Sequence, residues 1–229
     1  MAMGVKGRCG AWTIHLLVLA GPGYADGDLR LVDAVQKKDT ATARSLLNGT
    51  PPRERVDVNA AQNDGATALH WAAHWDDVEM AELLIRAGAD VNTANDYGVT
   101  ALALACTNRN SALVQKLLEA RANPNAAQTT GVTPLMECAR TGSIAAVRSL
   151  LTRGASVHAT HARTGQTALM WAAAGTHTDI VKLLIEHGAQ ARPAAARAIR
   201  GRVELRFAED FAPIQIGRAS CRERVSSVV

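Results

Sequence analysis

The chain has 229 residues, of which 48% are hydrophobic, 20% are charged and only 3% are aromatic. This composition can supply a core and excludes wholesale disorder, while the shortage of aromatic residues argues against a β-sandwich or β-barrel. The formal net charge is +4, but residues 1–25 contribute +2 and residues 193–229 contribute +3, so residues 26–192 carry −1. No basic stripe that could bind nucleic acid remains, and no apolar run reaches the roughly 18 residues of a membrane span.

Residues 1–25 are predicted to be a secretory signal peptide. Lys6 and Arg8 form the charged start, and the apolar stretch 11–20 that follows is too short to cross a membrane. Small residues end the segment, so cleavage is expected after Ala25. The predicted location is therefore periplasmic or secreted, and the alternatives are an uncleaved anchor or a misassigned start codon.

Residues 28–60 are predicted to form a degenerate N-terminal capping repeat. Two helix-like runs, 31–35 and 43–47, flank a polar stretch, and the proline-containing segment 50–55 lengthens the loop that follows. This pattern is typical of a terminal unit, which needs one packed face and one wet face.

Residues 61–192 contain four copies of a pattern with a period of 33 or 34 residues. Each copy opens with a glycine, has a threonine two positions later and continues into a run of small residues. The opening glycines are Gly65, Gly98, Gly131 and Gly165. A second helical run containing a Leu-Leu pair follows in each copy, and three of the copies then continue with Gly-Ala. The threonines are placed to cap the first helix of each copy.

This pattern resembles the ankyrin repeat, which has 33 residues and begins its first helix with a sequence similar to Thr133-Pro134-Leu135. The resemblance covers residues 28–192. It implies an all-α solenoid of helix-turn-helix units with projecting hairpin loops, and a scaffold that binds other proteins through its concave face and hairpin tips. We therefore expect a non-catalytic, monomeric protein that binds a protein partner and uses no cofactor, metal or nucleic acid.

The resemblance and the repeat register together give the candidate partner-binding residues. Four of them lie four residues after the threonine of their repeat, so they form one line along the stack at the border of the concave groove. A fifth is one helical turn after the first of these, and three more form a hairpin tip. The candidates are Trp71, Leu104, Glu137 and Trp171 in the line, Trp75 beside it, and Asn95, Asp96 and Tyr97 at the tip. For the tryptophans, the alternative is that each indole only packs against the neighbouring repeat.

The histidines and cysteines that could bind a metal or react are interpreted as structural residues. His70 and His74 are one turn apart, but Trp71 stands where the helical zinc-protease pattern requires a glutamate, and His70 matches the family's structural histidine. Cys106 and Cys138 could pair in an oxidising compartment, but they are interpreted as two small buried side chains.

One repeat departs from the pattern at the end of its second helix. Arg121 stands where the other repeats have Gly88, Gly154 and Gly188, which are expected in the left-handed conformation. An arginine in that conformation should cost about 1 kcal/mol.

Residues 193–229 leave the repeat pattern and are expected to have little ordered structure. Residues 216–225 resemble the translated read-through of a common sequencing adapter, so the tail is expected to be at least partly artefactual; a disordered basic tail is the alternative. If the natural protein continues further, the repeats could be the N-terminal accessory module of a longer exported enzyme. A secreted effector is the remaining alternative function.

Overall fold

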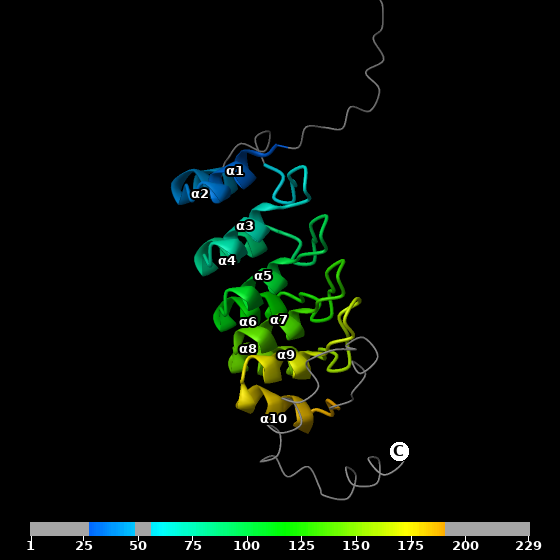
Figure 1. The fold of residues 1–229 in the computed structure, drawn as a ribbon. Helices are drawn as coiled ribbons and strands as arrows, with labels where there is room; N and C mark the ends of the chain where they lie inside the picture. The colour runs from blue at the N-terminus through cyan, green and yellow to red at the C-terminus, as the bar shows by residue number, and fades with distance from the viewer. Residues whose placement is uncertain (1–27, 49–55, 191–229) are drawn as a thin grey trace, which may run out of the picture.

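The computed structural model describes residues 28–48 and 56–190, which form a stack of five helix pairs (Figure 1). The first helices of the pairs are α1 (Arg30–Gln36), α3 (Ala68–His74), α5 (Ala101–Thr107), α7 (Pro134–Thr141) and α9 (Ala168–Ala174). The second helices are α2 (Thr40–Asn48), α4 (Val78–Arg86), α6 (Ser111–Glu119), α8 (Ile144–Thr152) and α10 (Thr178–Glu186). We call α1 and α2 the capping pair and the other four pairs the first to fourth repeats.

The pairs stack in two layers. First helices contact first helices of the neighbouring pairs, and second helices contact second helices. The first helices form the inner layer, beside loops that all project to the same side of the stack (Figure 1). Among the described residues no strand occurs, only isolated bridges between Ala61 and Thr67 and between Ala94 and Thr100. The predicted all-α solenoid is therefore confirmed.

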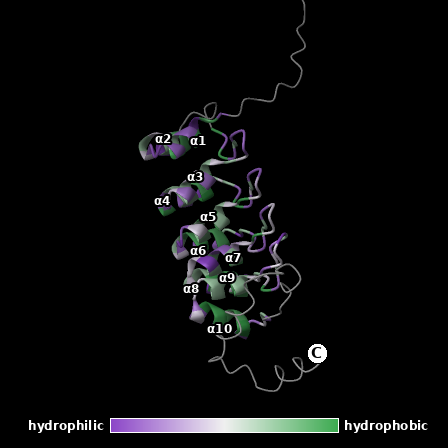
Figure 2. Cartoon of the chain, in the orientation of Figure 1, coloured by the Kyte–Doolittle hydropathy of each residue, from purple (hydrophilic) through white to green (hydrophobic). Residues whose placement is uncertain are grey.

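A single apolar core runs through the stack because no pair can cover its own apolar face. Equivalent leucines of the inner helices, Leu69, Leu102, Leu135 and Leu169, are all buried. Helix α2 buries only Ala43, so the capping pair leaves much of this helix in solvent. Figure 2 shows hydrophilic residues gathered at the ends of the projecting loops. The predicted signal peptide 1–25, the loop extension 50–55 and the tail 193–229 lie outside the described residues.

The threonine hydroxyl accepts a helix N–H in two of the four repeats. Thr100 and Thr133 accept hydrogen bonds from the backbone N–H groups three residues later, at 3.3 and 3.4 Å. Thr67 instead bonds to the ring of His70. The hydroxyl of Thr167 is buried and has no hydrogen-bond partner among the described residues.

The ends of the outer helices have the predicted backbone. Gly88 and Gly154 have φ of +96° and +83°, and Arg121 has φ of +68° at the equivalent position. The left-handed conformation predicted for Arg121 is therefore confirmed, although this region is unfavourable for a residue with a Cβ.

Asparagine side chains link successive loops in a regular ladder. Each asparagine amide donates to the carbonyl at the end of the next outer helix, and its oxygen accepts from the backbone N–H two residues beyond. The bonds run from Asn59 to Gly88 and Asp90, from Asn92 to Arg121 and Asn123, and from Asn125 to Gly154 and Ser156, at 2.7–3.3 Å. The next residue in this register is His158, whose side chain makes no such bonds within the described residues.

Cys106 of α5 and Cys138 of α7 form a disulfide, so the interpretation as two independent buried side chains was wrong. Their Cα atoms are 4.6 Å apart, and both residues are fully buried. The disulfide can form because of the spacing of the two cysteines in the sequence. They are 32 residues apart, one less than the repeat period. One cysteine therefore faces the following repeat while the other faces the preceding one, and the two side chains meet between adjacent inner helices.

Candidate functional site

The predicted line of residues lies at equivalent positions of the four inner helices of the repeats. Trp71, Leu104, Glu137 and Trp171 are all half-buried. The two tryptophans and Leu104 pack against the edge of the core. This line therefore combines packing on one side with exposed surface on the other.

The structure brings Trp71 and Trp75 together into a cluster with His74 and Lys38, which we call the tryptophan cluster. The two indoles are stacked, with ring centroids 6.3 Å apart, and the imidazole of His74 lies edge-on to both. The ammonium of Lys38, which comes from the turn of the capping pair, lies 4.1 Å from the centroid of the Trp75 ring. Such a contact is a cation–π interaction.

Hydrogen bonds fix the orientation of both indoles. The indole N–H of Trp71 donates to Oε1 of Gln62 at 2.9 Å, and Nε2 of Gln62 donates to Oε1 of Gln36 at 2.9 Å. The indole N–H of Trp75 donates to the backbone carbonyl of Gln36 at 3.1 Å. The indoles therefore have satisfied polar groups and can present their apolar faces to a ligand.

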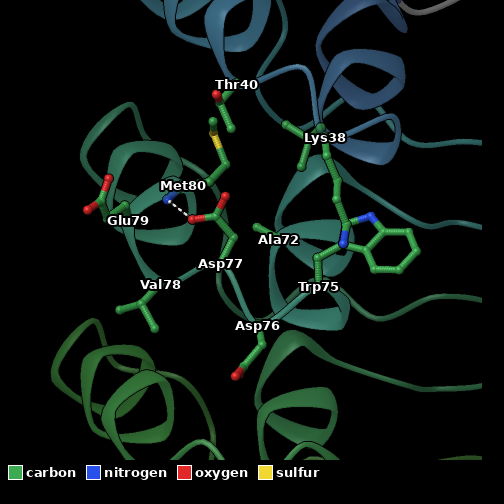
Figure 3. Close-up of a pocket in the computed structure, with 10 residues that line it drawn as sticks. Lys38, Thr40, Ala72, Trp75, Asp76, Asp77, Val78, Glu79 and Met80 are labelled. Atoms are coloured by element: carbon green, nitrogen blue, oxygen red, sulfur yellow. Dashed lines mark hydrogen bonds between the residues drawn. The ribbon is translucent and has the colours of Figure 1, made fainter.

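Two hollows adjoin the tryptophan cluster. The first, of about 520 Å³, lies between the turns of the capping pair and the first repeat and is lined by residues that include Lys38, Thr40, Trp75 and Met80 (Figure 3). The carboxylates at its edge have structural partners. Asp77 accepts from the N–H of Met80, Asp76 accepts from Asn110, and Glu79 pairs with Arg44.

The second hollow, of about 450 Å³, lies on the loop side of the cluster. Its lining residues are Leu29, Gln36, Gln62, Asn63, Asp64 and Trp71. None of these described lining residues is positively charged. We call it the Asp64 hollow.

The other members of the predicted line are placed farther along the stack. Glu137 forms an ion pair with Arg140 of the same helix at 2.7 Å. The indole N–H of Trp171 donates to Oε1 of Gln166 at 3.2 Å, and the ring of His161 lies 6.3 Å from that of Trp171. The structure thus joins Trp71 with Trp75 but gives Glu137 and Trp171 partners of their own.

The predicted hairpin tip has one structural and two outward-facing residues. The side chain of Asn95 accepts hydrogen bonds from the N–H groups of Tyr97 and Val99, so it holds the turn. Asp96 is exposed, and Tyr97 is 67% exposed. The backbone of Asp96 is bonded to Asp64 of the preceding loop, which leaves the Asp96 and Tyr97 side chains as the available contacts.

His70 has the structural role that the resemblance implied. Its Nδ1 accepts from the N–H of Thr67 at 3.2 Å, so its Nε2 carries the proton and donates to the carbonyl of Val99 in the next repeat at 2.9 Å. Burial lowers the pKa of His70, although the Val99 carbonyl and the charge of Asp64 act in the opposite direction. The neutral ring therefore joins two repeats.

The described residues place no three metal-ligating side chains together. Nor does any helix among them have the length and apolar composition needed to cross a bilayer. The sequence alone did not indicate roles for Lys38, Gln62 and Asp64. The contact of Lys38 with Trp75 joins two different units, and Gln62 and Asp64 lie in the loop before α3, outside the offset from the repeat threonine that placed the tryptophans. The only available signal was that Trp71 and Trp75 follow the one helix pair whose turn contains two consecutive lysines.

Comparison with known families gives one match, described as ankyrin repeats in three copies, over residues 31–128 and 111–195. These two ranges together span more than half of the chain. Comparison with curated proteins gives no match.

Proposed function

This chain belongs to the ankyrin-repeat family, and from that premise we propose that it is an exported, non-catalytic scaffold whose inner-helix face and hairpin tips bind a protein partner. A role in protein–protein interaction is general for stacks of these repeats. The finer proposal concerns where the chain acts and which residues contact the partner.

The observation that carries the binding proposal is the distribution of exposed large hydrophobic side chains. Among the described residues these are Trp75, Tyr97 and Ile144, with exposed fractions of 38%, 67% and 39%. Two of the three lie in the predicted site: Trp75 directly follows α3, and Tyr97 is at the next hairpin tip. Because tryptophan and tyrosine are enriched at interaction hot spots, these two side chains are the proposed primary contacts.

Removing each exposed side chain in turn tests this proposal. The full-length protein would capture its partner from extracts of the cells that express it, with Trp75→Ala, Tyr97→Ala and Ile144→Ala compared at matched concentration. We expect the first two changes to reduce capture at least roughly tenfold and Ile144→Ala to have little effect, as hot-spot residues differ from their surroundings. Loss of capture in Ile144→Ala alone would contradict the proposed face, and thermal melting would identify any variant that is unfolded.

Two features support the proposal of export. One is the sequence of residues 1–25, and the other is the disulfide between Cys106 and Cys138, since such bonds persist in oxidising compartments. The intact mass of protein purified from the periplasm or medium tests this. We expect a chain that begins after Ala25, whereas a chain that retains Met1 and is confined to the cytoplasm would contradict export.

A further inference from the structure

Hydrogen bonds determine which polar atoms face the Asp64 hollow. An indole N–H can only donate, so the oxygen of the Gln62 amide must face Trp71 and its nitrogen must face Gln36. This orientation places two amide oxygens, those of Gln62 and Gln36, along the hydrogen-bonded wall. With the carboxylate of Asp64, these oxygens give the hollow three acceptor groups beside the indole of Trp71, and Leu29 and Asn63 complete its lining.

The repeat that contains this hollow has a net negative charge, and Asp64 is the one charged residue among the described residues that line the hollow. Residues 61–93, which contain the first repeat, have six acidic residues and only one basic residue, Arg86, so their net charge is −5. The carboxylate of Asp64 has no ion-pair partner among the described residues. Its Oδ1 accepts a hydrogen bond from the N–H of Ala66 at 3.0 Å, and a carboxylate has further acceptor capacity beyond one such bond.

A positively charged side chain of this protein already contacts Trp75, the indole that is stacked on Trp71. Lys38 places its ammonium 4.1 Å from the ring centroid of Trp75, which is stacked on Trp71. The indole pair is thus positioned for cation–π contact, and Trp71 has the additional advantage of a nearby carboxylate.

We propose that the Asp64 hollow binds the guanidinium group of an arginine on the protein partner. The planar guanidinium can stack on an indole and donate two parallel hydrogen bonds to a carboxylate, and its remaining N–H groups can donate to amide oxygens. An ammonium lacks this planar geometry. The inference rests on the proposed function, because it assigns one contact within the protein-binding face.

Titration with a defined peptide tests the assignment. Blocked tri-arginine peptide would be added to the full-length, disulfide-bonded protein, and the indole N–H signals of Trp71, Trp75 and Trp171 would be followed by NMR. We expect saturable shifts centred on Trp71, with weaker binding of tri-lysine and no saturable shift with the neutral isostere tri-citrulline. Binding should weaken roughly fivefold or more in Asp64→Asn, as expected for loss of a charge-assisted hydrogen bond.

Asp90→Asn is the matched control for this variant. Asp90 is an exposed aspartate of the same repeat, and its Oδ1 also accepts from the N–H two residues later, so both substitutions remove one charge and keep the turn bond. Affinity for tri-arginine should change less than about twofold in Asp90→Asn, because Asp90 is solvent-exposed and does not line the hollow.

Three results would overturn the proposal. Equal weakening in both variants would show attraction to the general negative field, and equal binding of tri-lysine would remove the preference for guanidinium. An unmoved Trp71 signal would show that the hollow does not bind arginine. Partner capture that still depends on Trp75 would, in that case, leave the proposed function standing.

Discussion

At the scale of single residues, the backbone conformation at Arg121 departs most clearly from the repeat pattern. The end of the outer helix requires positive φ in each repeat, and Arg121 has φ of +68° where its counterparts are glycines. Nothing lies within 4 Å of a Cβ built at Gly154, so backbone strain alone distinguishes the two residue types there. Replacing Arg121 with glycine should therefore raise the free energy of unfolding, and replacing Gly154 with a larger residue should lower it.

Arg121→Gly is expected to stabilise the protein by about 1 kcal/mol because it relieves this strain. For a domain of this size, that corresponds to a rise in melting temperature of roughly 2–4 °C. The reverse change, Gly154→Ala, should lower stability by a similar amount. A lower melting temperature for Arg121→Gly would mean that the side chain contributes more than the strain costs.

His70 predicts a specific dependence of stability on pH. Its pKa is lowered in the folded state from the ordinary 6.5, so the unfolded chain binds a proton first as the pH falls. The contribution of His70 is therefore fully present above about pH 6.5 and is lost as the pH falls through and below that value.

Chemical denaturation at pH 7.5 and at pH 5.5 measures this contribution. Wild-type protein should lose stability between the two pH values, and His70→Gln should lose less because glutamine does not titrate. An identical pH dependence in both proteins would exclude His70 as the source.

At the scale of loops and helices, the asparagine ladder ends where a histidine replaces the expected residue. Asn59, Asn92 and Asn125 each make two bonds to the following repeat, and His158 occupies the next equivalent position. The groups that an asparagine would meet there are the carbonyl of Gly188 and the N–H of Gln190. The last loop-to-loop connection is thus weaker than the others.

His158→Asn is expected to stabilise the fourth repeat by about 1–2 kcal/mol through two new hydrogen bonds. Amide hydrogen exchange would locate the gain in α9 and α10. Asn92→His is the reverse substitution, and it should destabilise by a comparable amount. Unchanged exchange in α9 and α10 would show that this loop cannot adopt the geometry of the others.

The sequence was sufficient to predict the helices because their pattern recurs at a constant period. The offset from each threonine likewise placed Trp71, Leu104, Glu137 and Trp171 on equivalent positions. It was not sufficient for the contacts that join two units. The disulfide forms because Cys106 and Cys138 differ by one residue in their position within the repeat. The cation next to Trp75 is Lys38, which lies in the turn of the capping pair.

At the scale of the whole molecule, the described residues form a linear array of helix pairs with one disulfide cross-link between repeats. The disulfide joins α5 to α7 and so fastens the second repeat to the third. Apart from the polypeptide backbone, the other connections between the described repeats are packing contacts and hydrogen bonds or ion pairs. The bond therefore fixes the second repeat, whose hairpin tip carries the proposed contact Tyr97, to the third repeat.

Replacing both cysteines with alanine tests this contribution without overfilling the core. Alanine occupies the equivalent buried positions in other repeats, including Ala73 and Ala105. The chain-entropy model predicts a loss of about 3–4 kcal/mol for a closed loop of this length. Equilibrium denaturation would measure it, and a double variant as stable as the oxidised wild type would show that the link is dispensable.

We propose that the partner contacts the tryptophan cluster and the neighbouring hairpin tip. Site-specific photo-crosslinking tests this most directly, with benzoylphenylalanine placed singly at Trp75, at Tyr97 and at Gln115, which is exposed on the outer helix α6. If the partner binds at this face, crosslinks to the same partner protein form from positions 75 and 97 and none form from position 115. Crosslinks confined to position 115, or equal at all three positions, would contradict it.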